Sequence, residues 1–183
     1  MLEITYTTLV ILITAAWIIA CTAVSIKNKR LNVCRELALL TVYICIIVVA
    51  RFTFFPFRPV NGVIQPLIFD LSTAFPPKIN LIPLVFLFDY EVFREALINV
   101  IGNTTMFIPI GIVWPSVFKR LDTHGKVIAA GVGFSLIIEI LQLPFSDRVS
   151  DIDDLLLNSL GYICGYAIYL LVIKICQKGR KSK

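Results

Sequence analysis

Five long apolar runs separated by short polar segments dominate the chain. Each is long enough to be a membrane-spanning helix, because about 20 apolar residues cross the hydrocarbon core of a bilayer. The predicted spans cover residues 6–26, 36–55, 98–117, 127–143 and 155–175. Two shorter apolar runs, 63–71 and 81–88, are flanked by prolines and cannot cross. The pattern predicts an all-α polytopic membrane helix bundle with an interfacial or re-entrant segment between helices 2 and 3.

Composition supports a membrane protein with one domain. Hydrophobic residues make up 58% of the 183 residues and mean hydropathy is +0.87, which is too apolar for a soluble domain. We expect residues 1–183 to form a single integral membrane domain, with a motif-bearing core at 51–165 and a basic tail at 174–183. The first apolar run is expected to be an uncleaved anchor, because basic residues follow it instead of preceding it.

Basic residues gather in alternate connections, at 27–35, at 119–126 and in the tail. The positive-inside rule then places the N-terminus outside and the C-terminus in the cytoplasm. The net charge of +5 reflects this asymmetry, so nucleic-acid binding is not expected. The five cysteines show no CxxC spacing and are expected to be small packing residues.

Strongly polar side chains inside the predicted spans or next to them all lie near the outer-leaflet end. These residues are Arg51, Asn99, Asn103, Glu139, Gln142, Asp151, Asp154 and Asn158. A charge at the centre of a span costs about 2.5–3.5 kcal/mol on insertion scales, so a carboxylate such as Glu139 needs a partner or a function. The common depth predicts a shared polar site.

Helical periodicity places these residues on inward-facing stripes. The stripes are Ser135, Glu139 and Gln142; Asn99 and Asn103; and Asp151, Asp154 and Asn158. Gly161 and Gly165 continue the last stripe as a GxxxG motif, which lets another helix approach closely. Asp153 points the opposite way.

Structural roles are the alternative for each of these groups. Ser150 is a natural N-cap for the last helix, with Asp153 three residues later, and the helix dipole favours aspartates in a first turn. The two asparagines of the third span could link helices by hydrogen bonds. Arg51 and Glu139 could neutralise each other as a buried ion pair, and Arg148 could pair with a neighbouring aspartate.

The polar residues also belong to short motifs in a fixed order. The motifs are Arg51 with Phe55-Pro56-Phe57, Asn80-Leu81-Ile82-Pro83, Asn99-x-x-Gly102-Asn103, Phe107-Ile108-Pro109-Ile110-Gly111, Ser135-x-x-x-Glu139-x-x-Gln142 and Arg148-x-x-Asp151-x-Asp153-Asp154-x-x-x-Asn158-x-x-Gly161. This ordered set resembles the VanZ-like family. The resemblance implies a protein of the bacterial cytoplasmic membrane associated with resistance to teicoplanin, a lipid-tailed glycopeptide, and it implies no mechanism.

Three functions fit such a site. The first is non-enzymatic binding of a membrane lipid, a lipid-linked cell-wall precursor or a lipoglycopeptide, whose head group would enter an outer-leaflet cavity while its tail stays in lipid. The predicted binding residues are Arg51, Asn80, Asn99, Asn103, Ser135, Gln142, Arg148 and Asn158. The second is a membrane-embedded hydrolase or transferase acting on a lipid head group.

In that enzyme, Glu139, Asp151 and Asp154 would carry the acid–base chemistry. The same carboxylates could instead hold Mg²⁺ or Ca²⁺, whereas zinc is disfavoured because no histidine lies near them. We expect no metal and no cofactor. The third function is a channel or flippase, which the lack of an internal inverted repeat disfavours, although a homo-oligomer could build a path.

Overall fold

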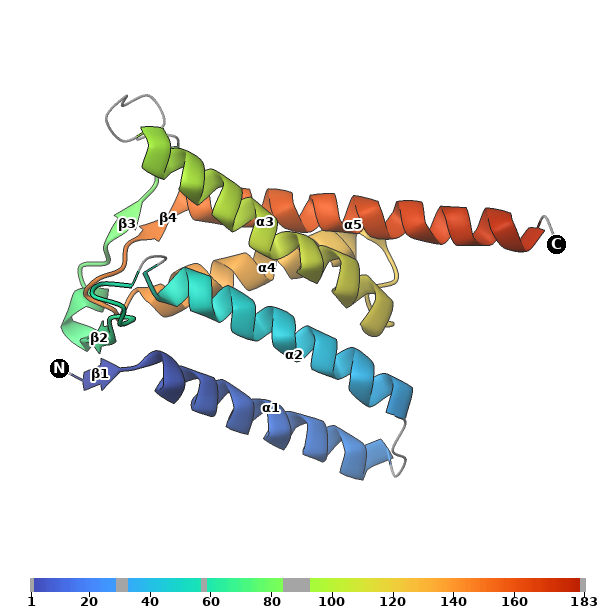
Figure 1. The fold of residues 1–183 in the computed structure, drawn as a ribbon, viewed down its shortest axis with the longest axis horizontal. Coiled ribbons are helices and arrows are strands. Elements are labelled where there is room, and N and C mark those ends of the chain that lie inside the picture. Colours follow the sequence, from blue (N-terminus) through green and yellow to red (C-terminus); the bar gives the residue numbers. More distant parts are fainter. Residues whose placement is uncertain (1, 29–32, 57–58, 84–92, 182–183) are drawn as a thin grey trace. The chain divides into compact units, whose positions relative to one another are not determined.

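The computed structural model describes residues 2–28, 33–56, 59–83 and 93–181 (Figure 1). Its five long helices are each apolar enough to cross a membrane, which confirms the predicted fold class. They are α1 (Tyr6–Asn28), α2 (Val33–Phe54), α3 (Phe93–Val117), α4 (His124–Gln142) and α5 (Ile152–Lys181). The last helix extends beyond the predicted 155–175 at both ends, because hydropathy marks only the apolar part of a helix, whereas backbone hydrogen bonds continue through polar residues.

The described residues of the connection between α2 and α3 form short elements. These are β2 (Leu67–Phe69), the 3₁₀ helix η1 (Leu71–Ala74) and β3 (Ile79–Asn80). β2 pairs antiparallel with β1 (Leu2–Ile4), and β3 pairs parallel with β4 (Ser150–Asp151). Phe57 and most of the predicted apolar run 81–88 lie outside the described residues.

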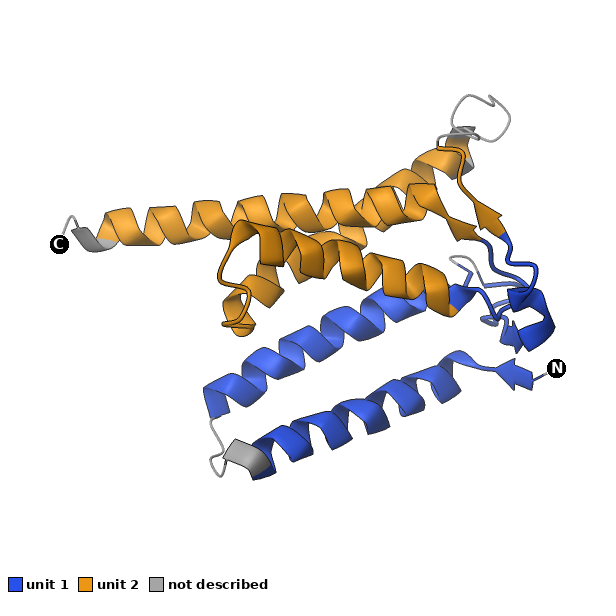
Figure 2. Ribbon diagram, turned by 180° about the vertical axis from the view of Figure 1, so that it is seen from behind, with its two compact units in different colours: residues 1–78, 142–149 blue, residues 79–141, 150–183 orange. Residues whose placement is uncertain are grey.

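The chain divides into two compact units (Figure 2). Unit 1 comprises Met1–Lys78 and Gln142–Val149, and therefore contains α1, α2, the β1–β2 pair and the segment after α4. Unit 2 comprises Ile79–Leu141 and Ser150–Lys183, and contains α3, nearly all of α4, α5 and the β3–β4 pair.

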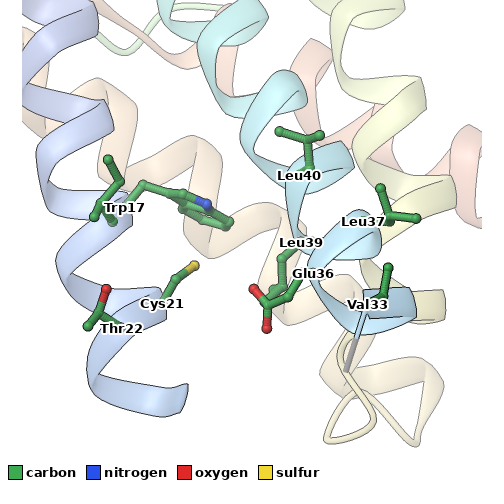
Figure 3. Close-up of a pocket in the computed structure, with 9 residues that line it drawn as sticks. Trp17, Cys21, Thr22, Val33, Glu36, Leu37, Leu39 and Leu40 are labelled. Carbon is green, nitrogen blue, oxygen red and sulfur yellow. The ribbon is translucent and has the colours of Figure 1, made fainter. Parts of the chain in front are cut away.

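In unit 1, α1 contacts α2 through a small number of aromatic and hydroxyl groups. The Thr14 and Tyr43 hydroxyl oxygens lie 2.7 Å apart, and the rings of Trp17 and Tyr43 are 5.9 Å apart. Beside these contacts lies a groove of about 540 Å³ between the two helices. Figure 3 shows Trp17 and Cys21 projecting toward α2, with the Glu36 carboxylate between the helices. The walls are otherwise mainly aliphatic, as expected for a surface that faces lipid.

In unit 2, α3 and α5 pack backbone to backbone through glycines. A Cβ atom added at Gly161 would overlap the main-chain carbonyl of Thr104, and one added at Gly165 would overlap that of Ile108. The predicted close approach of a helix to the GxxxG motif is thus confirmed, and the partner is α3. Small residues at such an interface allow extensive van der Waals contact in a membrane, where helices gain little from hydrophobic burial.

α4 joins unit 2 through larger side chains. The Phe134 ring lies 5.0 Å from that of Trp114 on α3. Gly131 leaves room for the ring of Tyr162 on α5, which is fully buried. Three helices therefore meet along one core, and the polar residues described next lie at the end of this core where α5 begins.

Candidate polar binding site

The site begins where the chain enters α5. Pairing with β3 keeps Ser150 and Asp151 extended, so the helix starts only at Ile152. The Asp151 Oδ1 atom accepts a hydrogen bond from the Asp153 backbone N–H at 2.9 Å. Asp151 is therefore the N-cap of α5, and the prediction of Ser150 at that position is wrong. The cap satisfies one of the backbone donors that the first turn of a helix leaves free.

Glu139 is tied to this helix start. Its side chain is only 3% exposed, and its Oε2 atom accepts a hydrogen bond from the Asp151 backbone N–H at 2.9 Å. The second carboxylate oxygen, Oε1, is buried and has no hydrogen-bond partner. On the other side, Asp151 Oδ2 accepts from the Asn80 amide at 3.1 Å. The β3–β4 pair thus brings the predicted residue Asn80 into the site from a distant part of the sequence.

A second group joins α3 to α5. The amide of Asn103 donates to the carboxylate of Asp154 and, at 2.8 Å, to Asn99 Oδ1. Asn99 in turn donates to Asp154 Oδ1 at 3.2 Å. Asn103 is buried, Asp154 is half-buried and Asn99 is exposed, so this group runs from the surface into the helix interface. The two predicted stripes on α3 and α5 do face each other.

A third group lies deeper, between α4 and α5. Asn158, which is 1% exposed, donates from Nδ2 to the hydroxyl of the fully buried Ser135 at 3.1 Å. The Oδ1 atom of Asn158 has no partner. Ser135 lies one turn before Glu139 on α4, and Asn158 lies one turn after Asp154 on α5. This pair therefore extends the polar contacts toward the middle of the unit.

The predicted site residues that belong to unit 2 are called the polar cluster. Its members are Asn80, Asn99, Asn103, Ser135, Glu139, Asp151, Asp154 and Asn158. They come from three helices and two strands, and hydrogen bonds connect them in three groups. Carboxylates and amides make up almost all of the cluster. In the described part of the chain, no three His, Cys, Asp or Glu side chains form a metal-binding group.

Three other predicted residues belong to unit 1. Gln142 Nε2 donates to the Thr53 carbonyl at 2.9 Å, and Arg148 Nε donates to the Phe54 carbonyl at 2.9 Å. These carbonyls end α2, where a helix leaves its last acceptors without intrahelical donors and its dipole favours positive charge.

Arg51 donates to the Pro56 carbonyl at 3.0 Å, and its guanidinium carbon lies 5.8 Å from the Tyr6 ring centroid. These contacts place all of its described partners in unit 1. Its pairing with Glu139 would join residues of different units and stays a prediction.

Sequence reasoning missed a polar contact near the start of α4. His124 Nδ1 lies 2.7 Å from the Tyr166 hydroxyl oxygen, and the neighbouring Tyr162 hydroxyl is buried without a partner. Tyr162 and Tyr166 extend the Asp154–Asn158 stripe by four residues at each step, so the periodicity contained the signal. His124 is 15 residues from Glu139, about 22 Å along α4 at 1.5 Å per residue, so it is not part of the polar cluster.

Comparison with known proteins gives one result at the level of the family. A family model described as VanZ/LLP1 matches residues 40–173, which is more than half of the chain. The match covers α3, α4 and about two thirds of α2, extends through most of α5, and leaves out α1. No curated protein and no solved structure matches.

Proposed function

We propose that this chain, which belongs to the VanZ/LLP1 family, is a non-enzymatic membrane protein that binds the head group of a lipid-linked or lipid-tailed amphiphile. The observation that carries the proposal is the polar cluster itself, held between helices that are long enough to cross a membrane. Buried carboxylates and amides are costly in such a bundle, so they are expected where a polar group is recognised.

The exposure of the surrounding residues suits an amphiphile. Asn99 and Asp154 form an accessible polar rim, while Leu97 and Ile101 on α3 are 44% and 56% exposed. A head group could therefore reach the rim while its hydrocarbon tail stays in the lipid that surrounds the exposed apolar side chains of the helices. This division between a polar contact and an apolar surface is the usual form of a site for a lipid.

The proposal includes an orientation, with the N-terminus outside and the C-terminus in the cytoplasm of a bacterial cytoplasmic membrane. The polar cluster would then lie in the outer leaflet. The expected ligands are membrane lipids, lipid-linked cell-wall precursors and lipoglycopeptides such as teicoplanin. Binding one of them at this depth would support a role in resistance to teicoplanin-type antibiotics.

The test is the lipid that purifies with the protein, identified by mass spectrometry. The wild type should retain one lipid class selectively, and Glu139→Leu should lose it, because leucine fills the space without accepting a hydrogen bond. Asp153→Asn is the matched control, since that side chain lies on the face of α5 predicted to point away from the polar cluster. A lipid profile that is identical in the wild type and Glu139→Leu would contradict the proposal.

A membrane-embedded enzyme is the second candidate, favoured by the contact between Glu139 and Asp151, which brings two carboxylate residues together. Glu139→Gln keeps the shape of the side chain but removes the transferable proton, which costs roughly 10²–10⁴ in rate for a general acid or base. A binding protein should instead keep part of its function, because the amide still accepts hydrogen bonds. Turnover of a lipid by the wild type, with none by a folded Glu139→Gln variant, would favour the enzyme.

A further inference from the structure

We infer that Arg51 binds the phosphate group of a membrane phospholipid, at a site built from residues of unit 1. The polar cluster belongs to unit 2, so this inference goes beyond the proposed function. The observation that carries it is a half-buried guanidinium near the end of α2, which the described residues of unit 1 leave with unused donors and without a counter-charge.

Arg51 lies at the boundary between the hydrocarbon core and the head groups. It is three residues before the end of α2, and its guanidinium carbon is 5.8 Å from the ring centroid of Tyr6, the first residue of α1. The candidate spans Tyr6–Ile26 and Val33–Phe54 therefore place both residues at a span end. Tyrosine is typical of this boundary, and the head groups of the bilayer begin just outside it. Lipid phosphates are thus the anions nearest to Arg51.

The guanidinium has unused donors and an unbalanced charge. It carries N–H groups on three nitrogen atoms, and of the described residues only Pro56 accepts from it, through its carbonyl to Nη1 at 3.0 Å. The rings of Tyr6 and Phe52 lie 5.8 and 5.4 Å from the guanidinium carbon, but rings carry no net charge. Within the described part of unit 1, Arg51 forms no ion pair with a carboxylate. A phosphate can fill this vacancy, because it accepts two parallel N–H bonds from one guanidinium.

An exposed apolar stripe on α2 starts beside Arg51. Ile44, Val48 and Phe52 follow one another at four-residue spacing and are 52%, 41% and 42% exposed. Ile44 and Val48 precede Arg51 by seven and three residues, which places them on its face of the helix. The stripe is about 12 Å long at 1.5 Å per residue, within the ~15 Å depth of one leaflet. An acyl chain can therefore contact the stripe while the phosphate is held by Arg51.

The experiment counts lipids bound to the full-length protein in detergent by native mass spectrometry. It compares phosphatidylglycerol with diacylglycerol of identical acyl chains, because only the first carries a phosphate. The wild type should prefer phosphatidylglycerol by about tenfold or more, a difference of about 1.4 kcal/mol. Arg51→Gln should reduce this preference to about twofold or less. Arg94→Gln is the matched control, since it removes the same charge from an exposed arginine of α3 and should leave the preference unchanged.

A conservative variant separates binding from folding. Arg51→Lys keeps the positive charge and should retain most of the preference, and thermal unfolding shows whether each variant is folded. Equal preference in the wild type and a folded Arg51→Gln would overturn the inference. Loss of the preference in Glu139→Leu but not in Arg51→Gln would assign the phosphate to the polar cluster and also overturn it. Displacement of phosphatidylglycerol by an equal concentration of inorganic phosphate would exclude a lipid as the source of the phosphate.

The same measurements test whether Glu139 already uses the charge of Arg51. In that case, Arg51→Gln and Glu139→Gln should each lower the free energy of unfolding, and the double variant should be no less stable than the weaker single variant. This non-additive result would overturn the inference, which predicts additive losses. A wild type without a preference for phosphatidylglycerol would overturn it too, and would leave the proposed function to its own test on Glu139.

Discussion

The backbone contact between α3 and α5 predicts a large effect from one added methyl group. In Gly161→Ala, the new Cβ would lie 2.8 Å from the Thr104 carbonyl carbon and 3.0 Å from its Cα, and closer still to its oxygen. These are backbone atoms of a helix, so no side-chain rotation can relieve the overlap. The two helices must separate, or α5 must shift along α3.

The size of the effect follows from these distances. Moving the 2.8 Å contact to the ~3.5 Å at which carbon atoms attract most strongly requires a separation of at least about 0.7 Å, and the closer carbonyl oxygen requires more. A gap of this size removes roughly a quarter to a half of the dispersion energy of each contact along the interface. We expect a loss of about 1–3 kcal/mol in the free energy of unfolding, the usual range for overpacking.

The assay is unfolding of the purified protein in mixed micelles by titration with SDS. Gly133→Ala is the control, because nothing lies within 4 Å of a Cβ atom at that position of α4, and it should be neutral or slightly stabilising. The double variant Gly161→Ala/Gly165→Ala should lose less than the sum of the single losses, since one separation relieves both overlaps. If Gly161→Ala is as stable as Gly133→Ala, the close packing of α3 on α5 is incorrect.

Three further predictions address topology, function and pH. In a variant without native cysteines, a cysteine at position 2 should react with a membrane-impermeant thiol reagent added to intact cells, and one at position 182 should not; the reverse would overturn the orientation. In a host that the wild type protects from teicoplanin, Glu139→Ala, Asp154→Ala and Arg51→Ala should each abolish protection and leave vancomycin sensitivity little changed, whereas full protection by the triple variant would remove any role for these residues. Hydrogen bonds from the Ser72 hydroxyl and backbone N–H hold the pKa of the Asp70 carboxyl below its ordinary value of 3.8. These bonds therefore stabilise the folded protein fully above pH 3.8, and the stabilisation is lost as the pH falls through the lowered pKa. Asp70→Asn should remove this acid-dependent loss of stability from thermal-unfolding curves measured over a series of pH values.

The helices could be predicted because their cause is local. A bilayer requires every backbone N–H and C=O to bond within the segment, so an apolar run of sufficient length is helical whatever surrounds it. The same local logic placed Asn103, Glu139 and Asp154 on inward-facing stripes, since a polar side chain in such a helix avoids lipid. It also identified Gly161 and Gly165 as a site of close approach.

Other features depend on contacts between distant residues and could not be read from periodicity. Asn80 reaches Asp151 because β3 pairs with β4, which has no hydrophobic pattern of its own. Because the same pairing keeps Asp151 extended, the N-cap of α5 is Asp151 and not the predicted Ser150. Gln142 lies on the same stripe as Glu139, yet its described hydrogen bond is with the end of α2. A shared stripe gives the direction of a side chain but not its partner.

The partners within the polar cluster are synthesised at different times, so the cluster is completed in steps during membrane insertion. Glu139 is synthesised 12 residues before Asp151, whose backbone N–H donates a hydrogen bond to it. Asn103 precedes its partner Asp154 by 51 residues. At a synthesis rate of about 5–20 residues per second, Asp154 is added roughly 3–10 s after Asn103. Until α5 is made, Asn103 lacks the Asp154 carboxylate and Glu139 lacks the Asp151 N–H. Completion of α5 closes the site, so truncations before residue 151 should be recognised as unfinished and degraded.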